Sequence, residues 1–141
     1  MHLTWEEFII NTKTKGDLGE IKIISDLIER NYNVSIPFSE DSRYDLIVDR
    51  NGNLERMQVK YVESDGVSIK VRCYNDNNRN VKYYTSKSID WLAAYDKTTD
   101  KCYYIHSSEI NKGRTEFTLR LEPPLNNQIK GIRFAKDYLK I

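Results

Sequence analysis

The sequence predicts one mixed α/β (α+β) domain over residues 1–141. Three observations predict this class: an amphipathic stretch near the start, a strong hairpin signal at Asn51-Gly52, and a series of short alternating segments after it. With 141 residues, of which 39% are hydrophobic and 30% charged, the chain is long enough to bury one core. No internal repeat or linker divides it.

Two helices are expected before the first strand. The first is a short helix over residues 4–10, and the second runs from Lys15 to Asn31. Thr14 and Asp17 fit a capping box at the start of the second helix. On a helical wheel its apolar residues fill one broad arc: Leu18, Ile21, Ile23, Ile24, Leu27 and Ile28.

Glu20 interrupts this apolar arc, because it falls between Ile23 and Leu27 on the wheel. A charge that points at a core is unfavourable unless it has a partner, such as a metal ion or a lysine. The alternative is that Glu20 lies at the rim of the arc and reaches solvent. Glu20 is therefore a candidate site residue with two open interpretations.

Residues 44–60 are predicted to form a β-hairpin. Asn51-Gly52 favours a type I′ turn, in which both central residues need positive φ. With these two residues as the loop, Asp45 faces Gln58 across the pair. Lys60 lies on the same face as Gln58 and is the diagonal neighbour of Asp45, at about 7–8 Å between Cβ atoms.

The other face of this hairpin is apolar in the same register. Tyr44 is expected opposite Val59, and Leu46 opposite Met57. A slip of one residue would mix the two faces, so the apolar pattern supports the register. A carboxylate, an amide and an ammonium thus gather on the polar face. Hard divalent cations take oxygen ligands of this kind, and a lysine beside them can hold a phosphate or an attacking water.

The remaining chain is expected to add short strands, a second hairpin and a closing helix. Proline residues and polar clusters separate these elements. The expected strands cover residues 32–38, 67–74, 81–84, 89–95, 102–105 and 116–121, with an exposed loop over 75–80, one helical turn over 107–110 and a C-terminal helix over 128–139.

Charge and composition exclude several classes of protein. No apolar run reaches the roughly 18 residues of a membrane span, and no P-loop is present, so we expect neither a membrane partner nor a nucleotide cofactor. Cys73 and Cys102 show no CxxC spacing, so we expect a cytoplasmic protein without disulfides.

The net charge is only +1, but residues 38–65 are acidic and basic stretches follow them. This pattern suits a metal-dependent phosphodiesterase, although a solvated surface of mixed sign gives the same pattern.

The order of these features resembles the PD-(D/E)XK nuclease superfamily. Its motif elements correspond to Gly16 to Glu20, Tyr44 to Val48 and Gln58 to Lys60. The similarity is to the QxK branch that includes group I intron homing endonucleases, and more distantly to archaeal Holliday junction resolvases. It implies a restriction-endonuclease-like αβββ core, with a central mixed sheet flanked by helices, plus a second hairpin and a C-terminal helix.

The resemblance also implies roles for the candidate residues. Asp45 would ligate Mg²⁺, for which Mn²⁺ would substitute, with help from Gln58 and the backbone carbonyl of Val59. Glu20 would complete the site from the helix, and Lys60 would orient or deprotonate the attacking water. Gln58 stands where the superfamily usually has a second acid, so this site has one negative charge fewer.

The function implied is that of a metal-dependent endodeoxyribonuclease acting on double-stranded or branched DNA. Cutting both strands needs at least two active sites, so a homodimer or homotetramer is expected. The basic residues expected to contact DNA phosphates are Arg43, Lys70, Arg72, Arg79 and Lys82.

Two rival interpretations stay open at this point. The first is a DNA-binding module with a nuclease-like fold that no longer cuts, for which Gln58 is the main argument. The second is a plain surface ion pair between Asp45 and Lys60, which contributes at most about 1 kcal/mol. The ion pair alone leaves the place of Glu20 unexplained.

Overall fold

The computed structural model describes residues 10–77, 80–127 and 129–141. The helix expected over residues 4–10 falls outside this part of the chain, except for Ile10. Within the described ranges, one α-helix, α1 (Thr12–Glu29), precedes a sheet of five strands. None of the described helices is long and apolar enough to cross a membrane.

Helix α1 begins earlier than the sequence pattern suggested. Asn11 is the N-cap, and its side chain accepts a hydrogen bond of 2.8 Å from the backbone N–H of Thr14. The capping box proposed for Thr14 and Asp17 is therefore wrong, since Asn11 already supplies the side-chain acceptor that the first turn needs. The buried stripe of α1 is also narrower than the predicted arc, with Ile21 62% and Ile28 57% exposed.

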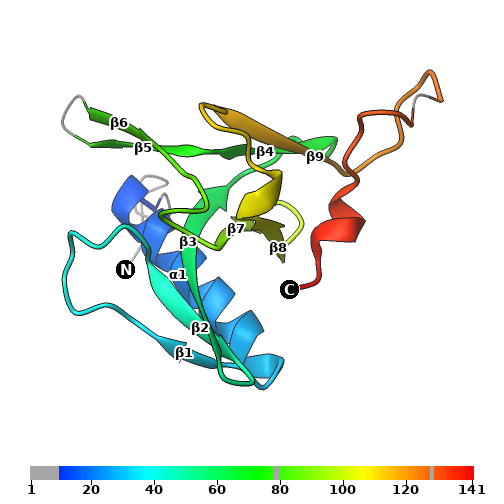
Figure 1. The fold of residues 1–141 in the computed structure, drawn as a ribbon. Helices are drawn as coiled ribbons and strands as arrows, with labels where there is room; N and C mark the ends of the chain where they lie inside the picture. Colours follow the sequence, from blue (N-terminus) through cyan, green and yellow to red (C-terminus); the bar gives the residue numbers. More distant parts are fainter. Residues whose placement is uncertain (1–9, 78–79, 128) are drawn as a thin grey trace, which may run out of the picture.

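The central sheet is mixed, as expected. Its order is β1-β2-β3-β7-β8, in which only the β3–β7 pair is parallel. The first four elements run α1, β1, β2 and β3, which confirms the αβββ order (Figure 1). The strands are β1 (Asn33–Ser35), β2 (Leu46–Arg50), β3 (Asn53–Val62), β7 (Trp91–Asp96) and β8 (Lys101–His106).

The β2–β3 hairpin has the predicted turn and register. Asn51 and Gly52 both have positive φ, at 56° and 93°. Leu46 pairs with Met57, and both are buried against α1. Tyr44 departs from the prediction. It precedes the first residue of β2, so strand alternation does not govern its side chain, and it packs on the opposite side of the sheet.

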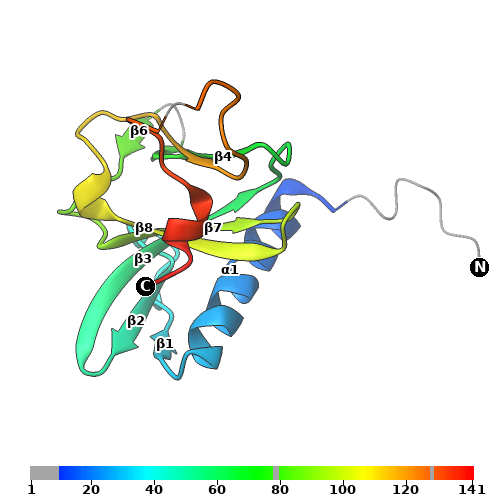
Figure 2. The same cartoon turned by 90° about the vertical axis from the view of Figure 1, so that its right-hand side faces the viewer.

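Two layers cover the two faces of the sheet. Helix α1 covers one face, where Ile23 and Leu27 pack against buried residues of β2, β3, β7 and β8. On the other face lies a two-stranded sheet of β4 (Ser68–Arg72) and β9 (Glu116–Arg120). Figure 2, turned from Figure 1, shows α1 below and β4 and β6 at the top. The inward residues of this second layer are buried: Ile69, Val71, Phe117 and Leu119.

The expectation of helices on both faces is therefore only half right for the described residues. One face carries α1, but the second is covered by strands, because β4 and β9 alternate apolar and polar residues and so present one apolar side.

Two further expectations were wrong. Residues 75–80, predicted as a loop, largely belong to a second small hairpin of β5 (Tyr74–Asn77) and β6 (Asn80–Tyr83). The C-terminal helix over 128–139 is also absent among the described residues of that range, which form only a short 3₁₀ turn, η3 (Ala135–Tyr138). Gly131 has a left-handed φ of 79°, and the backbone of Arg120 donates to Arg133 at 2.7 Å, so the chain there is extended.

The other expected elements are present with shorter or shifted ends: β1 covers only part of 32–38, and the strand expected over 67–74 is divided at Cys73 between β4 and β5. The strands over 89–95 and 102–105 form the β7–β8 hairpin, and the helical turn at 107–110 is η2 (Ser107–Glu109). Strand β9 matches the segment predicted over 116–121.

Candidate active site

Asp45 lies immediately before β2 and makes three hydrogen bonds with residues of β3. Its backbone N–H donates to the carbonyl of Met57 at 2.9 Å. Its carboxylate oxygen Oδ2 accepts two hydrogen bonds of 2.8 Å, from the side-chain Nε2 of Gln58 and from the backbone N–H of Val59. The hairpin register therefore brings Asp45 and Gln58 together, as the sequence predicted.

The pKa of Asp45 is raised above its ordinary value. Burial is the main cause, because it disfavours the charged carboxylate. The N–H of Val59 and the positive charge of Lys60 act in the opposite direction. The site thus holds a desolvated carboxylate whose charge is only partly compensated by the protein.

Lys60 lies on the same side of β3, but it does not pair with Asp45. Its ammonium donates to the backbone carbonyl of Tyr74 on β5 at 3.2 Å and lies 5.1 Å from the ring centroid of Tyr84. No ion pair within 4.0 Å joins it to Asp45 in the described structure, so the interpretation as a plain surface ion pair is wrong. Burial and then the charge of Arg72 lower the pKa of Lys60, whereas Asp45 raises it.

Glu20 reaches the same region from the third turn of α1. The close approach of α1 to β3 depends on Gly19, since a Cβ there would lie 3.4 Å from the Cβ of Tyr61. Glu20 is half-buried. Burial raises its pKa, and the negative charges of Asp45 and Asp17 raise it further. Glu20 therefore lies close enough to Asp45 for the two carboxylates to repel each other.

This donor set fits a hard divalent cation. Two carboxylates with raised pKa values share a region in which a cation would relieve both burial and repulsion. Gln58 now presents Nε2 to Asp45, so its amide must turn to offer Oε1 to an ion. Among the described residues no cluster of three His, Cys, Asp or Glu side chains could hold a metal, so an ion here must also use amide or backbone oxygens.

Asp45 and Gln58 line a cavity of about 530 Å³. Its opposite wall comes from the β5–β6 hairpin and from the segment that follows β6. Glu20 and Lys60 are not among its described lining residues, but each interacts electrostatically with Asp45. Besides Asp45 and Gln58, the lining residues are Glu40, Ser42, Arg43, Asn75, Lys82, Tyr83, Tyr84, Thr85, Lys87 and Ser88.

The basic residues predicted to contact DNA fall in three places. Arg43 and Lys82 line the cavity. Lys70 and Arg72 project from the exposed face of β4, with Arg72 near enough to Lys60 to lower the pKa of that amine. Arg79 lies outside the described residues.

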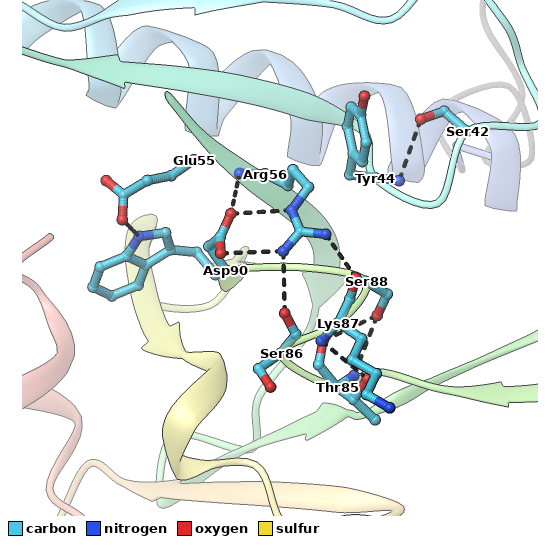
Figure 3. Close-up of polar contacts among 10 residues, drawn as sticks. Ser42, Tyr44, Glu55, Arg56, Thr85, Ser86, Lys87, Ser88 and Asp90 are labelled. Carbon is cyan, nitrogen blue, oxygen red and sulfur yellow. Dashed lines mark hydrogen bonds and ion pairs between the residues drawn. The ribbon is translucent and has the colours of Figure 1, made fainter. Parts of the chain in front are cut away.

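An ion pair that the sequence did not indicate supports one cavity wall (Figure 3). Arg56 on β3 meets Asp90 through Nε to Oδ2 at 3.1 Å and Nη2 to Oδ1 at 3.2 Å. The same guanidinium donates to the carbonyls of Lys87, at 2.7 Å, and Ser86, at 3.1 Å. Arg56 also holds the pKa of Asp90 below its usual value. The pair ties β3 to the segment over 85–90 and so shapes the cavity.

Tyr84 and Lys87 are among the cavity residues that the sequence analysis did not single out. Lys87 belongs to the basic stretch after residue 70, so its charge was a usable signal. Tyr84 gave no such signal, because a tyrosine at the end of a short strand is ordinary core material. Its place in the cavity wall follows only from the residues that surround it in the folded protein.

The arrangement of helix and mixed sheet is that of a nuclease fold. A solved structure described as a bacterial homing endonuclease, I-Ssp6803I, superposes with a TM-score of 0.72 over 92% of this chain and 88% of that chain, at 21% sequence identity. No protein with a curated description matches the sequence significantly.

The sequence itself carries the family assignment. The profile of the PD-(D/E)XK endonuclease family matches residues 10–141, so this chain belongs to that family. Nucleases of this family generally use divalent metal ions. The family assignment and the oxygen-rich donor set thus agree on the class of chemistry.

Proposed function

We propose that this protein is a metal-dependent DNA endonuclease that hydrolyses phosphodiester bonds of double-stranded or branched DNA in the cytoplasm. Mg²⁺ is the proposed ion, and Mn²⁺ a working substitute. One observation carries the proposal: Asp45 and Gln58 meet at the wall of a cavity, with Lys60 and Glu20 beside them.

The residues that would hold the ion are Asp45, Glu20, the turned amide of Gln58 and the carbonyl of Val59. When bound, the ion supplies a water of lowered pKa and a Lewis acid for the phosphoryl oxygen. The protein would supply two carboxylates, from Asp45 and Glu20. Gln58 would add a neutral oxygen ligand without a further negative charge. The donors come from α1 and the β2–β3 hairpin, which holds them in place on regular structure.

Lys60 is the residue proposed to act on the water and the phosphate. Burial and Arg72 lower the pKa of its amine, so a neutral form is reached at lower pH than for an exposed lysine. The neutral amine can accept a proton from the attacking water, and the ammonium can offset negative charge that develops on the phosphate.

The proposed DNA surface combines the cavity with the exposed face of β4. Arg43, Lys82 and Lys87 surround the cavity, and Lys70 and Arg72 extend the positive surface along β4. Such contacts to phosphate set affinity and register but carry no sequence information. The β4–β9 pair is a two-stranded antiparallel ribbon, a shape that the major groove admits.

A homodimer or homotetramer is the proposed assembly. One chain carries one candidate site, and cutting both strands of a duplex needs two. Light scattering of the purified protein measures the mass directly. A monomer at working concentration would argue for nicking of one strand.

The test of the function is a cleavage assay on supercoiled plasmid, a synthetic four-way junction and matched linear duplex. Each substrate is incubated with Mg²⁺, with Mn²⁺ and with chelator. Asp45→Ala and Lys60→Ala should both abolish metal-dependent cutting. Asp49→Asn is the matched control, because Asp49 lies on the same hairpin and only caps the turn at Gly52. Cutting that survives in Asp45→Ala would refute the assigned site.

A second candidate function is a DNA-binding module that does not cut. Gln58 in place of a second acid favours it, together with the lack of a three-acid cluster among the described residues. Tight, salt-sensitive binding to the same substrates without cutting under either metal would establish this alternative.

A further inference from the structure

The hydroxyl of Tyr84 is buried without a hydrogen-bond partner in the described structure. The residue is only 5% exposed, and its Oη is one of two buried side-chain polar atoms left unpaired among the described residues. Burying a hydroxyl without a partner is unfavourable, and tyrosine hydroxyls usually find one when buried. The unpaired group therefore needs an explanation of its own.

The other buried tyrosines of the described chain show the ordinary arrangement. Each of them places its hydroxyl against a named polar group. Tyr95 donates to Asp100 at 2.5 Å, Tyr103 shares a hydrogen with Thr99 at 3.1 Å, and Tyr104 donates to Asp26 at 2.5 Å. Tyr84 differs from these three, and it is also the one that lines the cavity of Asp45 and Gln58.

The surroundings of Tyr84 belong to the candidate active site. Its ring lies under the ammonium of Lys60, at 5.1 Å from centroid to Nζ. Its backbone N–H donates to the carbonyl of Cys73 at 3.0 Å, which anchors the residue at the end of β6. Burial and the negative charge of Asp45 raise the pKa of its phenol, so the hydroxyl stays protonated and remains a donor at neutral pH.

We propose that Tyr84 contacts the substrate, and that its hydroxyl donates a hydrogen bond to a non-bridging oxygen of the DNA phosphate held at Asp45 and Gln58. The inference rests on the proposed nuclease function. Lys60 is held in the free protein by one bond of 3.2 Å to the carbonyl of Tyr74. When a phosphate enters, Lys60 leaves that carbonyl, and the ammonium and the Tyr84 hydroxyl meet the same phosphate. The bond that the hydroxyl lacks in the free protein forms only with substrate.

Tyr84→Phe tests this directly, because it keeps the ring beneath Lys60 and removes only the oxygen. Loss of one preorganised donor of this kind lowers kcat by about 10²-fold. We expect that loss in single-turnover cleavage with Mg²⁺, with a smaller loss of DNA affinity measured in Ca²⁺, because the hydroxyl also contacts the bound phosphate. The melting temperature should hold or rise, because an unpaired buried hydroxyl has been removed.

Tyr103→Phe is the matched control. Tyr103 is buried on the same side of the sheet, and its hydroxyl bonds Thr99 rather than facing the site. This variant should melt at a lower temperature and cut at the wild-type rate. The two variants should therefore differ in both readouts: Tyr84→Phe loses cleavage but not stability, and Tyr103→Phe loses stability but not cleavage.

The outcomes separate the inference from the function on which it rests. Wild-type cleavage that Tyr84→Phe leaves intact would overturn this contact alone. A loss of cleavage accompanied by a lower melting temperature in Tyr84→Phe would show a packing role and overturn the contact as well. A cleavage loss shared with Tyr103→Phe would do the same. A wild-type protein that cuts none of the substrates under any metal would overturn both proposals.

Discussion

At the scale of single residues, the folded protein disfavours the charged forms of three side chains of the candidate site. Burial raises the pKa of both Asp45 and Glu20 and lowers that of Lys60. Each shift means that the charged form is disfavoured in the folded protein relative to an exposed side chain. Such shifts gather where a ligand later restores the balance, which is why they point to a functional site rather than to a stabilising network.

Asp45→Asn should keep or raise stability at neutral pH while it abolishes metal binding. The folded-state pKa of Asp45 is raised, so its penalty is absent below the unfolded-state value of about 3.9 and grows as pH rises through the folded-state value. The variant's Asn side chain still accepts from Val59. Metal at about 100 times its Kd should stabilise the wild type by about 2.7 kcal/mol and leave the variant unchanged.

Thermal melting across pH, with and without Mg²⁺, measures this prediction. The gap between variant and wild type should narrow as the pH falls towards the ordinary aspartate range. An equal metal-induced rise in both proteins would show that the ion binds elsewhere.

Arg72→Gln should move one limb of the pH–rate profile. The charge of Arg72 lowers the pKa of Lys60, so its removal raises that pKa. The limb that reports Lys60 should shift to higher pH when kcat is measured at saturating DNA. Lys70→Gln is the control, since Lys70 lies on the same exposed face of β4 and does not contribute to the shift. Unshifted profiles in both variants would remove Lys60 from the chemical step.

At the scale of elements, the site depends on how closely α1 approaches β3. The turn at Asn51-Gly52 sets the hairpin register and thereby aligns Asp45 with Gln58. It does not place Glu20, which arrives from α1 through the close contact of Gly19 with Tyr61. A turn and a helix–strand contact therefore control different halves of the same site.

Gly19→Leu should separate these two halves. A Cβ at Gly19 already comes within 3.4 Å of Tyr61, so a larger side chain must push α1 away and carry Glu20 from Asp45. Overpacking of this kind costs about 1–3 kcal/mol, and metal affinity should fall with it. Gly16→Ala is the control: its Cβ meets nothing within 4 Å, and it should stabilise α1 by up to about 1 kcal/mol without changing cleavage. Calorimetric metal titration distinguishes the two variants, and unaltered affinity in Gly19→Leu would exclude Glu20 as a ligand.

At the scale of the whole molecule, the cavity is a product of both layers. The β2–β3 hairpin and the residue before it supply Gln58 and Asp45, and β6 and the residue after it supply Lys82 and Tyr84. The Arg56–Asp90 ion pair holds the segment over 85–90 against β3 (Figure 3). We propose that the positive residues around the cavity contact the phosphates of the DNA.

The salt dependence of DNA binding should identify the residues of this surface. Each lost phosphate contact lowers the slope of log K against log salt by about 0.9. Arg43→Gln and Lys82→Gln should each show that change. Lys101→Gln should not, because Lys101 lies beside α1 on the opposite face. Fluorescence anisotropy at several salt concentrations measures the slopes, and an equal effect of Lys101→Gln would relocate the DNA surface.

The sequence by itself determined what depends on near neighbours. The positive φ at Asn51 and Gly52 and the alternation of β2 and β3 are local properties, so the hairpin and its polar face could be predicted, and the spacing of Glu20, Asp45 and Lys60 indicated the family. Only the tertiary structure decided the rest. Residues 129–139 lack the helix that their apolar pattern suggested, because Gly131 takes a left-handed φ of 79° and a bridge between Arg120 and Phe134 pairs this segment with β9.

The same holds for the cavity wall. Arg56 and Asp90 are 34 residues apart, and Tyr84 meets Lys60 only in the folded chain, where the residue after β6 packs into the core beside β3. Local periodicity records which side of an element is apolar, but it does not record which distant element will cover that side. The partners of Lys60 and the unpaired hydroxyl of Tyr84 are therefore consequences of packing between layers.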